Sequence, residues 1–185
     1  PPIFGLKDVD FFTNETIFDN RDAPDHLIVI GGGPVGVELA QAHCRLGVKV
    51  TVLEMFGVLG HEDPELADIV RRTLVEDGID IHENIRIAGI EGEDGSIRVK
   101  LDGDKGPTEI EGSHLLVAAG RKPNIDGLDL DNAGVDHTPK GVTVDKRLRT
   151  SNKKIFAIGD IAGPFQFTHM AGYHAGIVIR NALFR

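Results

Sequence analysis

One stretch of this chain constrains its fold more than any other, because a short apolar run stops at three consecutive glycines. The sequence LIVIGGGPVGVELA occupies residues 27–40. Residues 27–30 are typical of a strand buried in a parallel sheet. Pro34 is favoured in the first turn of a helix, which we predict to run to Arg45 or Leu46 before Gly47 ends it.

The spacing of the glycines within this strand–turn–helix predicts a binding site for a dinucleotide pyrophosphate. Gly31 and Gly33 would permit the tight turn and the close approach of backbone to phosphate. Gly36 would let the helix pack against the strand, and the free N–H groups of the first helical turn would face the phosphates.

The next strand ends in an acidic residue that specifies the cofactor further. Residues 48–54 are predicted to form a second buried strand, and Glu54 is its last residue. A carboxylate at this place can accept hydrogen bonds from ribose hydroxyls and would repel a 2′-phosphate. No Arg or Lys lies between Glu54 and His61 to bind such a phosphate. The sequence therefore predicts NAD(H) rather than NADP(H).

The remaining pattern indicates an α/β fold. A helix beginning at Asp63-Pro64 and ending near Gly78 precedes a third strand. Apolar residues then alternate by two over residues 85–101, with a turn at 93–95, and a short strand at 108–111 completes a three-strand antiparallel meander. Residues 114–120 return as a buried strand, so we predict a Rossmann-like parallel sheet with helices and this meander. A further strand at 155–160 and a helix at 168–183 follow.

Composition excludes several classes of function. The net charge of −9, without any Lys/Arg cluster, argues against nucleic acid as a partner. No apolar run approaches the ~20 residues that span a bilayer, and no secretory signal is visible. The single cysteine, Cys44, is expected to be a buried structural thiol, which suits a cytoplasmic protein. The histidines show no metal-ligand spacing, so no metal site is expected.

Four segments in this order resemble one family. They are GGGPVGVELA, the acidic end of TVLE, AAGRKPN at 118–124, and IFAIGD at 155–160 followed by FTHMAG. Together they resemble the class I flavin-dependent pyridine nucleotide–disulfide oxidoreductases, in particular the dihydrolipoamide dehydrogenase and mercuric reductase branches. The resemblance implies an NAD(H)-binding domain over residues 24–145 and partial FAD-domain segments over 1–23 and 146–185.

The resemblance also implies roles for individual residues. The NAD(H) contacts would include the glycine turn, which comprises Gly31, Gly32, Gly33, Pro34, Val35 and Gly36, and the ribose acceptor Glu54. They would also include Glu38 near the nicotinamide, Ile87 on the adenine and Gly120, which closes over the cofactor. The FAD contacts would be an aspartate on the ribityl chain and a helix start at the flavin pyrimidine: Asp160, Gln166, Phe167, Thr168 and His169.

Each of these side chains has a simpler alternative role. Glu38 can serve as an acid favoured by the helix dipole, and Ile87 can be a core residue of the meander. Asp160 can cap a turn, and Thr168 and His169 can cap or pack.

The family also has parts that do not match this sequence. These are an amino-terminal FAD half with a redox-active cysteine pair, and a carboxy-terminal dimerisation domain with a His–Glu pair. The resemblance therefore implies a fragment without catalytic residues of its own, inactive alone and homodimeric when full length.

The expected function is electron entry into a flavoprotein. NADH would pass hydride to FAD, and the flavin would reduce a disulfide, of the lipoamide type, or a related acceptor. Two alternatives remain open: a non-enzymatic NAD-sensing Rossmann module, and a cysteine-independent flavin NADH oxidase or ferredoxin reductase. The terminal electron acceptor is not specified by these residues.

Overall fold

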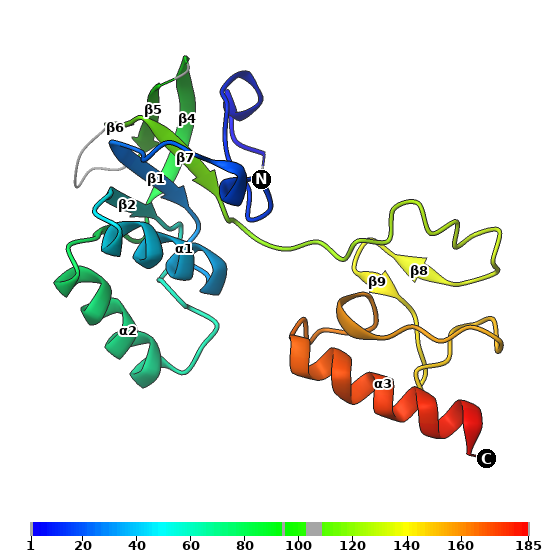
Figure 1. The fold of residues 1–185 in the computed structure, drawn as a ribbon. Helices are drawn as coiled ribbons and strands as arrows, with labels where there is room; N and C mark the ends of the chain where they lie inside the picture. The colour runs from blue at the N-terminus through cyan, green and yellow to red at the C-terminus, as the bar shows by residue number, and fades with distance from the viewer. Residues whose placement is uncertain (1, 94, 103–108, 185) are drawn as a thin grey trace. The chain divides into compact units, whose positions relative to one another are not determined.

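The computed structural model describes residues 2–93, 95–102 and 109–184, which divide into two compact units (Figure 1). Unit 1 extends to Gly120, and unit 2 begins at Arg121. The assignment of residues 24–145 to an NAD(H) domain and of the flanking segments to an FAD domain stays a prediction. No helix among the described residues has both the length and the apolar character needed to cross a bilayer.

Unit 1 is built on a four-stranded parallel sheet with the strand order β3-β2-β1-β7. The strands are β1 (His26–Ile30), β2 (Lys49–Leu53), β3 (Asp80–His82) and β7 (His114–Val117). Two helices connect the first three of them, α1 (Pro34–Arg45) and α2 (Pro64–Glu76). The first helix matches its predicted bounds, and the second begins as predicted, because the Asp63 carboxylate accepts hydrogen bonds from two backbone N–H groups of its first turn.

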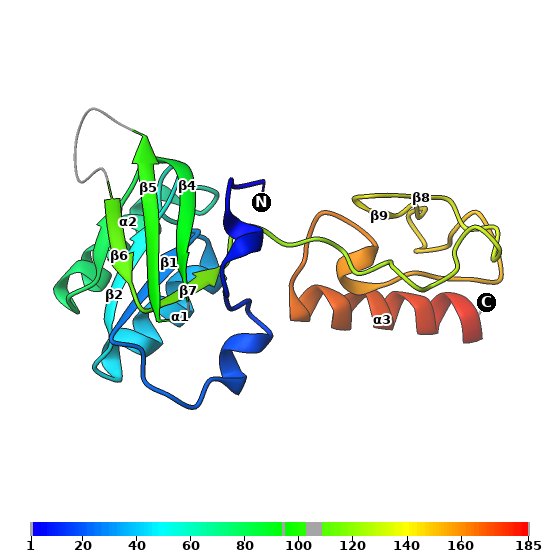
Figure 2. The same ribbon diagram turned by 90° about the horizontal axis from the view of Figure 1, so that it is seen from above.

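The predicted meander is confirmed as a separate antiparallel sheet of β4 (Arg86–Glu93), β5 (Ser96–Asp102) and β6 (Glu109–Gly112). Figures 1 and 2 show α1 and α2 on one face of the parallel sheet and this second sheet on the other face. Asp94 of the predicted 93–95 turn and Thr108 of the predicted third strand lie outside the described residues.

Side chains of β1 alternate between two cores, as a strand covered on both faces requires. Leu27 and Val29 pack in the core beneath the helices. Ile28 and Ile30 pack in the core beneath the meander. All four residues are at most 4% exposed, so the apolar run of the sequence is buried on both faces.

The segment before β1 also belongs to unit 1. It contains the 3-10 helices η1 (Leu6–Asp8) and η2 (Thr16–Asp19). Leu6 and Ile17 are buried in the two cores of the unit. Phe12 lies beside β7, because its N–H donates to the Leu115 carbonyl oxygen at 2.7 Å and its own carbonyl accepts from the Val117 N–H at 2.8 Å.

Unit 2 contains the short strands β8 (His137–Thr138) and β9 (Gly141–Val142), the 3-10 helix η3 (Gly159–Ile161) and helix α3 (Thr168–Leu183). The predicted helix at 168–183 is confirmed. The predicted strand at 155–160 is wrong, since only Phe156 forms a bridge, with Arg149. Gly159 has φ +69 and turns the chain into η3, which ends any extended pairing there.

We expect the stability of unit 1 to depend on pH through His26. Burial lowers the His26 pKa from its ordinary value of 6.5, and the positive charge of Lys49, its neighbour on β2, lowers it further. The folded chain therefore binds fewer protons than the unfolded chain between the lowered pKa and 6.5. The contribution of His26 to the free energy of unfolding should be fully present above about pH 6.5. The free energy of unfolding should then decrease as the pH falls through this window.

Urea denaturation between neutral and mildly acidic pH measures this effect. A His26→Gln variant keeps a polar partner for the Thr51 hydroxyl, which lies 2.8 Å from the His26 Nε2. Its unfolding free energy should fall less steeply with pH than that of the wild type. Identical slopes for the two proteins would contradict the assignment.

Candidate functional site

The chain turns sharply at Gly31, directly after β1. The Gly31 N–H donates to the Leu53 carbonyl oxygen at 2.9 Å, and its φ of +112 is a value that side chains strongly disfavour. A Cβ at this position would lie 2.6 Å from the carbonyl oxygen of Ala118. Only glycine therefore fits between the ends of β1 and β7.

The other two glycines of the motif have opposite surroundings. A Cβ on Gly36 would overlap the carbonyl oxygen of Gly31, so helix α1 rests directly on the turn. A Cβ on Gly33 would meet no atom within 4 Å. The glycine turn is thus packed tightly at its helix and open at Gly33, which is the side where a phosphate can approach the backbone.

Helix α1 presents unpaired donors on this open side. It begins at Pro34 after Gly33, without a side-chain cap. Across the described part of the chain, no acceptor is paired with the N–H groups of Gly33, Val35 or Gly36. These donors and the positive end of the helix dipole favour a bound anion.

Glu54 lies against the same turn, as the sequence predicts for a residue at the end of β2. Its Oε2 accepts a hydrogen bond from the Gly32 N–H at 2.6 Å, and its Oε1 accepts one from the Phe56 N–H at 2.9 Å. The Gly32 N–H is therefore used to hold the carboxylate and is not free for a phosphate. Two backbone bonds fix Glu54 beside the open face of the turn, where its remaining lone pairs can accept from a diol.

Three other candidate residues of unit 1 are less constrained. Glu38 is exposed on α1, beyond its first turn. Ile87 is half-buried and packs against the core beneath the meander, which fits its alternative role as a core residue. Gly120 is exposed, has φ +110 and has open space where its Cβ would lie.

The candidate flavin residues all lie in unit 2. Asp160 is exposed within η3. Phe167 precedes the first turn of α3, which has no side-chain cap, and its ring stacks on His169 with centroids 5.3 Å apart. The Gln166 carbonyl oxygen accepts from the Arg121 guanidinium at 3.0 Å, and Thr168 is the first residue of the helix.

Three residues that the sequence does not indicate contact the glycine turn or the loop that follows β2. Val58 and Leu59 follow β2, and Glu83 follows β3. The Leu59 N–H donates to the Gly32 carbonyl oxygen at 2.8 Å, and Glu83 accepts from the Val58 N–H at 2.7 Å. Both segments resemble ordinary loops in the sequence, so no local pattern indicates that they meet.

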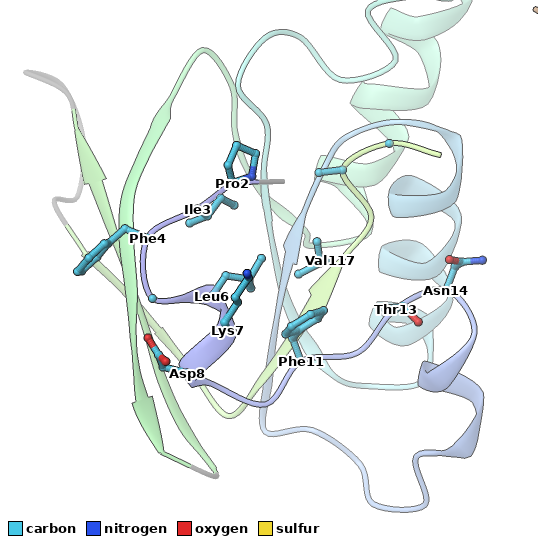
Figure 3. A pocket seen from close by; sticks show the side chains of 13 residues that line it. Pro2, Ile3, Phe4, Leu6, Lys7, Asp8, Phe11, Thr13, Asn14 and Val117 are labelled. Carbon is cyan, nitrogen blue, oxygen red and sulfur yellow. The ribbon is translucent and has the colours of Figure 1, made fainter. Parts of the chain in front are cut away.

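A cavity of about 620 Å³ lies elsewhere in unit 1, between the N-terminal segment and the end of β7. Figure 3 shows Leu6, Phe11 and Val117 among its lining side chains, and the backbone of Gly120 also borders it. Of the candidate cofactor residues, this cavity includes only Gly120, so it is distinct from the open face of the glycine turn.

Neither Cys44 nor a cluster of metal-ligating side chains adds a reactive centre among the described residues. Cys44 is half-buried against the helix-side core, and its thiol donates to the Asp77 carbonyl oxygen at 3.2 Å. Within the described ranges, no group of three or more His, Cys, Asp or Glu side chains could hold a metal ion.

Comparison with known proteins identifies the family of this chain. The family model described as "pyridine nucleotide-disulphide oxidoreductase" matches residues 1–175. Mercuric reductase of Streptomyces lividans is 36% identical over 99% of this chain, and dihydrolipoyl dehydrogenase of Bacillus subtilis is 35% identical over 90% of it. The chain spans only 39% and 37% of the lengths of these two relatives.

A solved structure is similar over nearly the whole chain. It is the HOCl-induced flavoprotein disulfide reductase RclA of Escherichia coli, as a Cu(II) complex, with a TM-score of 0.88 and 32% identity over 99% of this chain and 42% of the other. Fold, motif order and the match to the family model agree, and the chain belongs to the pyridine nucleotide–disulphide oxidoreductase family.

Proposed function

We propose that unit 1 binds NAD(H) and delivers electrons to a flavin in a longer oxidoreductase. The observation that carries this proposal is the placement of Glu54, whose carboxylate is held on the glycine turn by the Gly32 and Phe56 N–H groups. The open side of Gly33 and the unpaired donors of α1 would bind the pyrophosphate. Glu54 would accept hydrogen bonds from the adenosine ribose and disfavour NADP(H).

The residues of unit 2 are compatible with FAD. Asp160 is an exposed carboxylate that can accept from ribityl hydroxyls, and the uncapped start of α3 offers backbone donors that stabilise negative charge. Bound FAD would take hydride from NADH and reduce a disulfide, of the lipoamide type, or a related acceptor. We propose that this acceptor chemistry and a homodimer require the rest of the longer protein.

Binding measurements on the 185-residue chain test the proposal. The chain should bind NADH weakly, retain no FAD after purification and reduce no lipoamide. Fluorescence titration with NADH and the flavin absorption of the purified protein are the measurements. A yellow protein, or turnover of lipoamide with NADH, would refute the proposal that the fragment is only the electron-entry part.

Glu54→Arg should shift the cofactor preference towards NADPH. The substitution removes the ribose acceptor and supplies a cation for the 2′-phosphate, which should change the ratio of NADH to NADPH affinities by about tenfold or more. Parallel titrations with the two cofactors measure this ratio. Glu54→Gln is the matched control, since it removes the negative charge but keeps one oxygen acceptor. If the ratio did not move in Glu54→Arg, Glu54 would not be the ribose contact.

Gly33→Ala and Gly36→Ala should separate binding from folding. The added methyl at Gly33 meets open space, so stability should change by less than about 1 kcal/mol while NADH affinity falls. The methyl at Gly36 would overlap the Gly31 carbonyl oxygen and should lower the unfolding free energy by about 2 kcal/mol. Chemical denaturation and NADH titration of both variants check this; equal behaviour of the two would contradict the assigned roles.

A further inference from the structure

The loop between β2 and α2, residues 54–63, contacts the glycine turn. The Leu59 N–H donates to the Gly32 carbonyl oxygen at 2.8 Å. Val58 is buried, and a Cβ on Gly32 would lie 2.9 Å from its Cγ2, so the two residues are in close contact. The same loop supplies the Phe56 N–H that Glu54 accepts. The position of this loop therefore affects both the glycine turn and Glu54.

This loop contains an unfavourable backbone conformation. Leu59 has φ +54, in the left-handed region that bulky side chains rarely adopt. Such a conformation persists only when neighbouring contacts hold it. The bond from the Leu59 N–H to Gly32 is one such contact, and two others are the hydrogen bond from the Glu62 N–H to the Leu59 carbonyl oxygen and the packing of Leu59 against the helix-side core.

The chain after β3 also holds this loop in place. The Glu54 N–H donates to the His82 carbonyl oxygen at 2.9 Å, and the Asn84 N–H donates to the Phe56 carbonyl oxygen at 2.8 Å. The Ile85 N–H also donates to the Glu54 carbonyl oxygen, at 3.3 Å. Further along the loop a side chain makes the contact, because the Glu83 Oε1 accepts a hydrogen bond from the Val58 N–H at 2.7 Å. Glu83 is half-buried, which shields this bond from water.

We propose that Glu83 is a positioning residue for the adenosine half of NAD(H). Its carboxylate holds Val58, and through it the strained Leu59, against the glycine turn, and so keeps the Phe56 N–H on Glu54. Glu83 does not itself contact the cofactor in this proposal, and it acts through the loop that orients the ribose acceptor. The inference rests on the proposed function of unit 1.

Three substitutions at Glu83 separate the properties of its side chain. Glu83→Ala removes the acceptor, and Glu83→Asp keeps the charge but is too short by one methylene to keep the same bond. Glu83→Gln keeps the reach and an oxygen acceptor without the charge. We expect Ala and Asp to raise the Kd for NADH about tenfold, and Gln to stay within about threefold of the wild type.

Two further measurements distinguish positioning from general stability. ADP-ribose lacks the nicotinamide, so its Kd should rise by the same factor as that of NADH if the effect lies at the adenosine half. Asp145→Ala is the matched control, because Asp145 in unit 2 also accepts backbone N–H groups with its carboxylate, from Arg147 at 2.8 Å and Arg149 at 3.0 Å. It should lower the melting temperature while leaving the Kd for NADH unchanged.

The outcomes separate this inference from the function on which it rests. A wild-type chain that binds neither NADH nor ADP-ribose refutes the proposed function, and this inference with it. A wild type that binds both, with Glu83→Ala within twofold of it, refutes the role of Glu83 alone. Glu83→Gln as weak as Glu83→Ala overturns the hydrogen-bond argument. If Glu83→Ala does not fold, the Asp and Gln variants carry the same comparison.

Discussion

Helix α1 can rest directly on the end of β1 because no side chain separates them. Gly31 and Gly36 bring the helix start against the turn, and Gly31 also lies against the backbone of Ala118, directly after β7. This close approach aligns the unpaired N–H groups of the first helical turn with the carboxyl edge of the parallel sheet. Strands β2 and β3 add Glu54 and Glu83 from that same edge. The candidate site is thus a consequence of helix packing at two glycines.

The elements of unit 1 could be predicted well from the sequence because their signals are local. An apolar run before Gly31, a proline at position 34 and the Asp63-Pro64 pair each specify an element within a few residues. The alternation over residues 85–101 likewise indicated a meander. These patterns follow directly from strand and helix periodicity, and the structure contains all of these elements.

Contacts between loops could not be predicted in the same way. The bond from Val58 to Glu83 joins residues 25 positions apart, and neither segment has a periodic pattern. The prediction of a strand at residues 155–160 was wrong for a different reason. An apolar run is typical of a strand whether or not a neighbouring strand exists to pair with it. In unit 2 Phe156 has a bridge only to Arg149, and the positive φ of Gly159 ends the extended segment. Local composition favours a strand there, but pairing is a property of the fold.

The contact of Phe12 with β7 has a consequence for the edge of the parallel sheet. Strand β7 is the last in the strand order, so among the described residues no further strand of this sheet lies beside its outer edge. Phe12 forms a parallel bridge with Leu116, and its carbonyl oxygen accepts a hydrogen bond from the Val117 N–H. An unpaired sheet edge is a template for pairing with another chain, and the segment before β1 therefore blocks part of this edge.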